Sequence, residues 1–179
     1  GAGPQRCHPN RSTGDAWPER RRRGGILIAY RPAEARDVTT LRSMLQALAD
    51  HDGGDYAVGS EAGLLQHGFG QRPLFWAMLA ERGGQALGML IYYPDYSTHR
   101  GEAGVYVQDI YVSDAARGLG VGRGLLAAML RQQDWGAQFI TLGVSADNAV
   151  AMGFYGRIGF RQRGYEMMIL DGQMLEALQ

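Results

Sequence analysis

A glycine-rich stretch of six residues stands between a strand-like run and a helix-like run. The apolar run 105–112 precedes it, the helical pattern of 123–135 follows it, and it reads Arg117-Gly118-Leu119-Gly120-Val121-Gly122. Glycines at alternate positions permit a tight turn and leave the backbone N–H groups free to converge. The helix that follows directs the positive end of its dipole at the same spot. The sequence therefore predicts a phosphate-binding turn between a strand and a helix.

Two well-known nucleotide-binding motifs do not fit this stretch. The dinucleotide fingerprint needs a glycine at the sixth position, where counting from Gly118 gives Arg123, and no second βαβ half is visible. A P-loop needs Gly-Lys-Ser or Gly-Lys-Thr, and the chain has neither. A turn with a purely structural role is the remaining alternative for a glycine cluster taken alone.

Composition narrows the class of protein and of partner. The chain has 179 residues, of which 45% are hydrophobic, so it can bury one core. Its 18 basic residues balance 18 acidic ones, which does not favour a nucleic acid or a membrane surface and leaves a small molecule as the expected partner. Cys7 is the single cysteine, so we expect neither a disulfide framework nor a cysteine-based metal site. No apolar run reaches the ~18 residues of a membrane span, and we expect a cytoplasmic protein.

The first 25 residues differ from the rest of the chain. They are rich in Gly, Pro, Arg and Ser, lack periodic apolar residues, and end with the run Arg20-Arg21-Arg22-Arg23-Gly24-Gly25. The arginine run suits a nucleic-acid or targeting patch, but no apolar stretch of signal-peptide length follows it. We expect a disordered or extension tail over 1–25 and a single domain over 26–179.

From residue 26 onward, strand-like and helix-like patterns alternate. A hairpin is expected at Arg82-Gly83-Gly84, between two antiparallel strands. Helices are expected after Pro32, from Ser60 to Gly68, and over 123–135 and 148–158. In the first of them, apolar residues at three-to-four spacing should face a sheet: Val38, Leu41, Leu45 and Leu48. In the third, a buried stripe is expected at Leu125, Leu126, Met129 and Leu130. Strands are expected over 26–30, 74–81, 85–93, 105–112, 138–144 and 160–170, the last with a break near Gly164, and 96–104 is expected as a polar connection. Strands before and after long helices indicate a mixed α/β sheet.

Three further motifs accompany the glycine stretch at fixed spacing. They are the strand Gln108-Asp109-Ile110-Tyr111-Val112, the segment Asn148-x-x-Ala151-x-x-Phe154-Tyr155-x-x-x-Gly159-Phe160, and Ser60 to Pro73 with its Gly68-Phe69-Gly70. With Arg-x-x-Gly-x-Gly at 117–122, the first two resemble the GNAT superfamily of acyl-CoA-dependent N-acetyltransferases. The third is similar to the spermidine/spermine and thialysine N-acetyltransferase branch. The resemblance covers residue 28 to the C-terminus. It implies a mixed, mostly antiparallel twisted sheet of about six to seven strands with about four flanking helices, and a homodimer.

The same resemblance implies acetyl-CoA as co-substrate and no metal. Ile110 and Val112 would pair with the pantetheine arm, the N–H groups of 118–123 would hold the pyrophosphate, and a strand N–H near Ile110 would stabilise the oxyanion. Arg117 and Arg123 are plausible charge complements for phosphate. The expected cofactor-binding residues are Ile110, Tyr111, Val112, Arg117, Gly118, Leu119, Gly120, Val121, Gly122, Arg123, Asn148 and Tyr155.

Acetyl transfer to an amine needs groups that move protons. A lysine-type amine has a pKa of about 10.4, and holding it neutral at pH 7 costs roughly 4.6 kcal/mol. The departing thiolate needs a proton donor, for which a tyrosine hydroxyl is suited. Tyr155 lies seven residues after Asn148 and four after Ala151, so the three share a helix face. A helical tyrosine is often structural, but the resemblance implies that Tyr155 is the general acid.

Gln108 and Asp109 are the candidates for handling the amine. Because successive strand side chains alternate, we expect them on opposite faces, with only one facing the reacting centre. The branch usually has glutamate at the position of Gln108. A glutamine accepts no proton at neutral pH, although its carbonyl can orient an amine or a water. The proton then leaves through Asp109, through a water chain, or from a less basic amine, and a structural role for Asp109 stays open.

The acceptor is expected to be a small primary amine. Gln66, His67, Gln71 and Gln108 stand where residues of the branch tend to be acidic. Loop acids can still supply charge, although each taken singly is expected to be a solvated surface acid: Asp50, Asp52, Asp55, Asp95 and Glu102. A diamine or polyamine, a lysine analogue and an amino acid all remain candidates. No Ser-His-Asp or Cys-His arrangement is recognisable, so we expect direct attack in a ternary complex. The alternative is a non-catalytic acyl-CoA-binding sensor with the same fold.

Overall fold

The computed structural model describes residues 27–53, 57–164 and 167–178. It divides into two compact units, Gly1–Gly143 and Val144–Gln179. The tail expected over 1–25 lies outside the described residues. The single domain expected over 26–179 stays a prediction.

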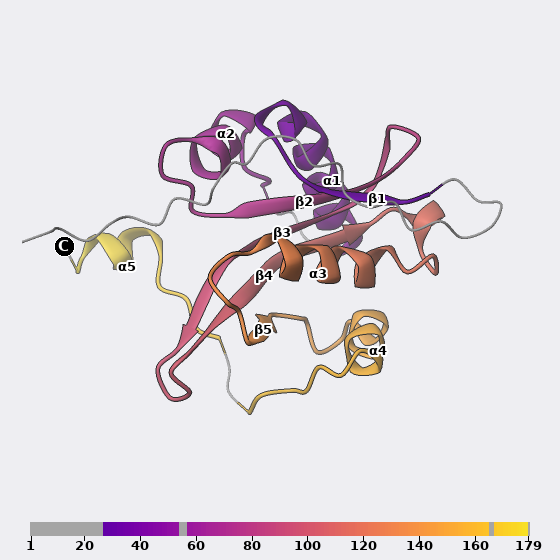
Figure 1. Cartoon of the computed structure of the whole chain (residues 1–179). Helices are drawn as coiled ribbons and strands as arrows, with labels where there is room; N and C mark the ends of the chain where they lie inside the picture. The colour runs from indigo at the N-terminus through magenta and orange to yellow at the C-terminus, as the bar shows by residue number, and fades with distance from the viewer. Residues whose placement is uncertain (1–26, 54–56, 165–166, 179) are drawn as a thin grey trace, which may run out of the picture. The chain divides into compact units, whose positions relative to one another are not determined.

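The first unit is built on one mixed sheet. Its strands follow chain order, with antiparallel neighbours except for the parallel pair at the end: β1 (Ala29–Pro32), β2 (Trp76–Arg82), β3 (Gln85–Ser97), β4 (Glu102–Val112) and β5 (Phe139–Leu142). The mixed α/β class is confirmed. Within the described residues the sheet has five strands rather than the expected six to seven. Figure 1 shows the long β3 and β4 running side by side through the sheet.

Two hairpins link the central strands. Gly83 and Gly84 both have positive φ, 56° and 79°, as the expected tight turn between β2 and β3 requires. The polar connection expected over 96–104 is much shorter, because β3 runs on to Ser97 and β4 already begins at Glu102. The N–H of Gly101 closes this turn by donating to the carbonyl of Ser97 over 2.8 Å.

Helices cover both faces of the sheet. On one face, α1 (Val38–His51) buries Leu41 and Met44 against β2 and β3, where the core holds Ala77, Leu79, Met89 and Ile91. α2 (Glu61–Phe69) begins as expected at Ser60, whose Oγ accepts a hydrogen bond from the N–H of Gly63 over 3.1 Å. On the other face lies α3 (Val121–Gln132), whose buried residues include Leu125 and Met129 (Figure 1). The apolar stripes predicted for α1 and α3 therefore face the sheet, except that Leu130 of α3 is exposed.

Two helices lie among the described residues of the second unit. α4 (Ala149–Arg157) confirms the helix expected over 148–158, and α5 (Gly172–Glu176) was not expected. The strand expected over 160–170 is wrong for the described part of that range, because 160–164 and 167–170 contain no strand. A strand needs a neighbouring strand to satisfy its N–H and C=O groups, and no described strand pairs with these residues. Among the described residues, no helix has the length and apolarity needed to cross a membrane.

Candidate active site

A β-bulge in β4 changes which side chains share a face of the sheet. Ile91 of β3 pairs with Asp109, whereas the next residue, Tyr92, pairs with Val107, so Gln108 is the extra residue. A bulge shifts the alternation of the strand by one position. Gln108 and Asp109 therefore lie on the same face, toward α1, and the expectation of opposite faces is wrong.

Contacts around Gln108 agree with this assignment. Tyr93 follows Ile91 by two residues on β3, so it shares the face toward α1. Its hydroxyl donates to Oε1 of Gln108 over 3.3 Å. Its ring stacks on Tyr106, with the centroids 5.0 Å apart and the planes 17° apart. The carbonyl of Gln108 is thus already engaged by a neighbouring tyrosine.

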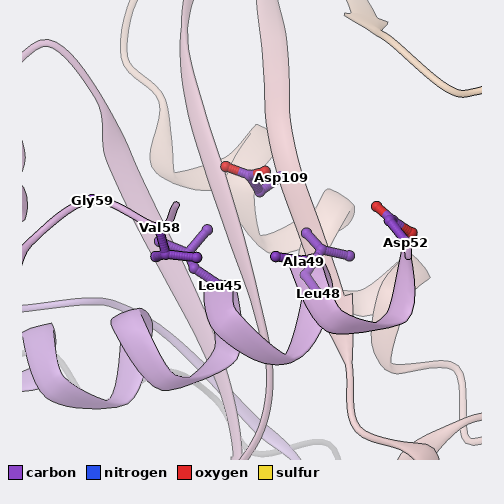
Figure 2. A pocket seen from close by; sticks show the side chains of 7 residues that line it. All are labelled: Leu45, Leu48, Ala49, Asp52, Val58, Gly59 and Asp109. Carbon is purple, nitrogen blue, oxygen red and sulfur yellow. The ribbon is translucent and has the colours of Figure 1, made fainter. Parts of the chain in front are cut away.

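Asp109 borders a pocket between β4 and the C-terminal half of α1. The pocket has a volume of about 330 Å³. Figure 2 shows Asp109 across from Ala49, with Asp52 at the end of the helix. The lining combines apolar side chains with these two carboxylates, and consists of Leu45, Leu48, Ala49, Asp52, Val58, Gly59 and Asp109.

The surroundings make Asp109 a stronger base than an ordinary aspartate. Burial raises the pKa of Asp109, and the negative charge of Asp52 raises this pKa further. Both effects disfavour the ionised form. The pKa of Tyr93 is raised too, first by burial and then by Tyr106, Asp95 and Asp109. A carboxylate of raised basicity beside a pocket is a candidate proton acceptor.

The glycine stretch forms the predicted turn at the start of a helix. Gly118 and Gly120 have φ of 77° and 79°, and Gly120 is the N-cap of α3. The helix starts two residues earlier than expected, so Val121 and Gly122 belong to its first turn. N–H groups of a first turn have no acceptor within the helix. A Cβ added to Gly118 or Gly120 would have no other atom within 4 Å, so the space beside both glycines is open and leaves room for a ligand.

The two arginines that flank this turn are exposed. Arg117 already forms an ion pair with Asp114, with 2.9 Å between its Nη2 and the carboxylate. Arg123 lies in the first turn of α3, with its side chain exposed. For an anion, the turn therefore offers mainly backbone N–H donors, with two exposed guanidinium groups beside them.

One edge of β4 carries backbone groups directed away from β3. The N–H of Ser113 donates to the carbonyl of Leu87 over 2.9 Å, so these two residues form a hydrogen-bonded pair. Such pairs alternate along an antiparallel ladder, which directs the N–H groups of Val112 and Ile110 away from β3. On that side, β5 pairs only with Gly104 to Val107. Ile110 and Val112 therefore present N–H groups beyond the end of the β4–β5 ladder.

The remaining expected site residues belong to the second unit. Asn148 caps α4, because its Oδ1 accepts a hydrogen bond from the N–H of Ala151 over 3.0 Å. Tyr155 is buried, and its ring centroid lies 5.2 Å from that of Phe154 and 5.4 Å from that of Phe160. All other expected site residues lie in the first unit.

Sequence reasoning missed most of the pocket wall. Leu45 and Leu48 were predicted only as part of a helix stripe that faces the sheet, and Val58 and Gly59 carried no signal. Asp52 is one of the five acids expected to supply charge from loops, and it lines the pocket. In the part of the chain that the structure describes, no group of three or more metal-ligating side chains occurs.

Comparison with known proteins identifies a family. The model of the Acetyltransferase (GNAT) family matches residues 41–160. Thialysine N-epsilon-acetyltransferase of Bos taurus is 27% identical over 166 residues, which cover 85% of this chain and 97% of that protein. Spermidine/spermine N(1)-acetyltransferase-like protein 1 of Homo sapiens is 34% identical over 104 residues, 54% of this chain and 15% of that protein.

Solved structures show the same fold. An integron cassette protein from the mobile metagenome of V. cholerae gives a TM-score of 0.69 at 21% identity, over 84% of this chain and 96% of that one. An aminoglycoside acetyltransferase from an uncultured soil metagenomic sample, solved with sisomicin, gives 0.65 at 13% identity, over 80% and 97%.

Proposed function

Because this chain belongs to the GNAT acetyltransferase family and is an N-acetyltransferase, we propose that it acetylates the primary amine of a small molecule with acetyl-CoA. The amine attacks directly in a ternary complex. The observation that carries the proposal is Asp109, a carboxylate of raised pKa at the border of a pocket of about 330 Å³. Pockets of ~300 Å³ and more are typical of small-molecule sites.

Asp109 is the proposed base. An alkylammonium ion must lose a proton before its nitrogen can attack, and the raised pKa of Asp109 makes that transfer less unfavourable than to an ordinary carboxylate. Gln108 lies on the same face, but its carbonyl accepts from Tyr93 and its amide takes up no proton. We assign Gln108 to orienting the amine or a water, and Asp109 to accepting the proton.

Backbone groups of the first unit suit acetyl-CoA. The N–H groups of the α3 first turn and the open positions at Gly118 and Gly120 fit a pyrophosphate, with Arg117 and Arg123 beside them. The N–H groups of Ile110 and Val112 suit an extended amide-containing arm. When bound, acetyl-CoA supplies the acetyl thioester. The N–H near Ile110 is then the proposed donor to the oxygen on which negative charge develops.

Tyr155 is the proposed general acid, with Asn148 among the cofactor-binding residues. The hydroxyl of Tyr155 would protonate the departing thiolate. The substrate nitrogen gives up two protons, one to Asp109 before the attack and one as the amide forms. One of the two replaces the proton that Tyr155 gives to the thiolate, and the other is released to solvent. Support for this role comes from the family membership and from the motif around Tyr155. The phenol ring is held between Phe154 and Phe160, which limits its orientations.

The pocket and the named relatives support a proposed acceptor class. Relatives are named for thialysine and for spermidine/spermine. We propose a diamine or polyamine, a lysine analogue or an amino acid as acceptor. The apolar residues of the pocket suit the methylene chain that these amines have in common.

A thiol-release assay tests the proposal. The wild-type chain is incubated with acetyl-CoA and a panel of polyamines, lysine analogues, amino acids and aminated antibiotics, and the acetylated product is identified by mass spectrometry. We expect turnover with at least one class. Tyr155→Phe should lower turnover by at least about tenfold while acetyl-CoA binding is retained. Tyr96→Phe, at an exposed tyrosine of β3, is the matched control. Binding of acetyl-CoA without turnover of any amine would favour the sensor instead.

A further inference from the structure

Asp52 lies where α1 ends and lines the same pocket as Asp109. Its backbone N–H donates to the carbonyl of Leu48 over 3.0 Å, which makes it the C-cap of the helix. Its side chain borders the pocket (Figure 2). The two carboxylates therefore approach one cavity from different elements, one from α1 and one from β4.

A carboxylate at this position is unfavourable for the stability of the fold. The C-terminus of a helix carries partial negative charge, so an acidic group there is destabilising. Asp52 also repels the ionised form of Asp109. His51 lies 3.4 Å from Asp52 and is half exposed, which makes it a weak compensating partner. A residue that breaks local rules in two ways at a pocket is expected to serve function.

We propose that Asp52 is a specificity-determining residue that selects amines by the charge at their far end. It favours a substrate with a second cationic group and disfavours one with a carboxylate there. The inference rests on the proposed function, because it takes this pocket as the acceptor site. The wall between the two carboxylates is apolar, with Leu45, Leu48 and Ala49 on the α1 side, and suits a short methylene chain. Among the candidate acceptors, free amino acids are therefore the least favoured.

Three substrates with the same five-carbon chain show how the charge at the far end affects the rate. 1,5-Diaminopentane, lysine and pentylamine all offer a primary amine on a five-carbon chain, with a cation, a zwitterion and no charge at the far end. We expect the wild-type kcat/KM to be highest for 1,5-diaminopentane. Asp52→Asn should lower the ratio of kcat/KM for 1,5-diaminopentane to kcat/KM for lysine by about tenfold. This is the effect expected of one charge contact near a protein surface. Most of the change in this ratio should appear in KM. Pentylamine reports the change common to all amines, including the effect of the lost Asp52 charge on the pKa of Asp109, and the loss for 1,5-diaminopentane should exceed it.

Matched variants keep the test specific. Asp52→Glu retains the charge and should restore the preference. Asp50→Asn removes the same charge from an exposed position of α1, where Asp50 accepts from Nε2 of Gln46 over 2.9 Å, and should leave the preference unchanged. Asp52→Asn should unfold at the same or a higher temperature, since it removes a repulsive charge. Equal losses for pentylamine and 1,5-diaminopentane, or an unchanged ratio, would overturn the role of Asp52 while the proposed function stands. A wild-type chain that acetylates no amine would instead overturn the proposed function and this inference with it.

Discussion

At the scale of single residues, Asp109 is expected to lower the stability of the fold while it supports activity. Its pKa in the folded state lies above its ordinary value, so its ionised form is disfavoured by folding. The folded chain then binds more protons than the unfolded chain between these two pKa values, and stability falls as the pH rises through them. At neutral pH, Asp109→Asn removes this unfavourable charge.

Asp109→Asn is therefore expected to lower kcat/KM by about a hundredfold or more, while the free energy of unfolding stays equal or rises. Steady-state kinetics and urea unfolding at pH 7 check the two halves. Asp50→Asn serves as the control and should change neither. A variant that loses activity because it unfolds would place Asp109 among the structural residues of β4.

Alanine substitutions at two glycines with the same φ distinguish an effect on backbone strain from an effect on acetyl-CoA binding. Gly120 and Gly84 both have φ of 79°, and a built Cβ meets nothing within 4 Å at either. Replacing either by alanine should destabilise the fold by about 1–2 kcal/mol, since the left-handed region disfavours a Cβ. Only Gly120→Ala should also raise the KM for acetyl-CoA several-fold, because a methyl group then occupies the space beside the proposed pyrophosphate site. Equal KM values in the two variants would remove Gly120 from that site.

At the scale of elements, periodicity predicted the helices and strands of the first unit but not the details that form the site. The Leu41, Leu45 and Leu48 stripe placed α1 on the sheet, and Ser60 marked the start of α2. Alternation failed at Gln108, because a bulge depends on the register between two strands and one strand's own pattern does not contain it. The strand expected over 160–170 failed for a related reason. Apolar residues favour a strand, but a neighbouring strand must be present to form hydrogen bonds with its backbone.

A shared arginine joins β1, β2 and the turn before α1. Arg31 binds Asp37 and Glu81 at once, and its shortest contact to each carboxylate is 2.6 Å. The guanidinium lowers the pKa of Asp37. Hydrogen bonds to charged groups contribute about 1.5–3 kcal/mol each, so Arg31→Met should destabilise the fold by about 3 kcal/mol.

The acid dependence of stability tests the same contact. The contribution of Asp37 is fully present above the pKa of an unfolded aspartate, about 3.9, and is lost as the pH falls through its lower folded-state value. Urea unfolding between pH 7 and pH 3 should therefore show a smaller loss of stability in Arg31→Met than in the wild type. Arg36→Met is the control, because the Arg36–Glu34 pair is exposed on both sides and should contribute less than about 1 kcal/mol. Parallel curves for wild type and Arg31→Met would contradict the role of the ion pair.

At the scale of the whole molecule, the proposed sites for the amine and for acetyl-CoA use different parts of the sheet of the first unit. The face toward α1 carries the pocket with Asp109, and the edge directed away from β3 carries the N–H groups of Ile110 and Val112. Because Asp109 and Ile110 are neighbours in β4, the proposed base and the proposed oxyanion donor come from adjacent residues. This arrangement follows from the bulge, which turns Asp109 toward the pocket while the strand continues.

The homodimer implied by the resemblance is the remaining prediction for the whole chain. Met167, Met168 and Ile169 are 77%, 96% and 85% exposed, a consecutive apolar run of the kind that soluble monomers rarely leave uncovered. We expect light scattering after size exclusion to give twice the 19.6 kDa of one chain. Met168→Lys should lower the dimer fraction, because burying a lysine in an apolar contact is costly. Leu74→Lys, at a residue 65% exposed in the first unit, is the control and should leave the dimer intact. A monomer at every concentration up to the solubility limit would contradict the dimer, and a dimer unaffected by Met168→Lys would place its interface elsewhere.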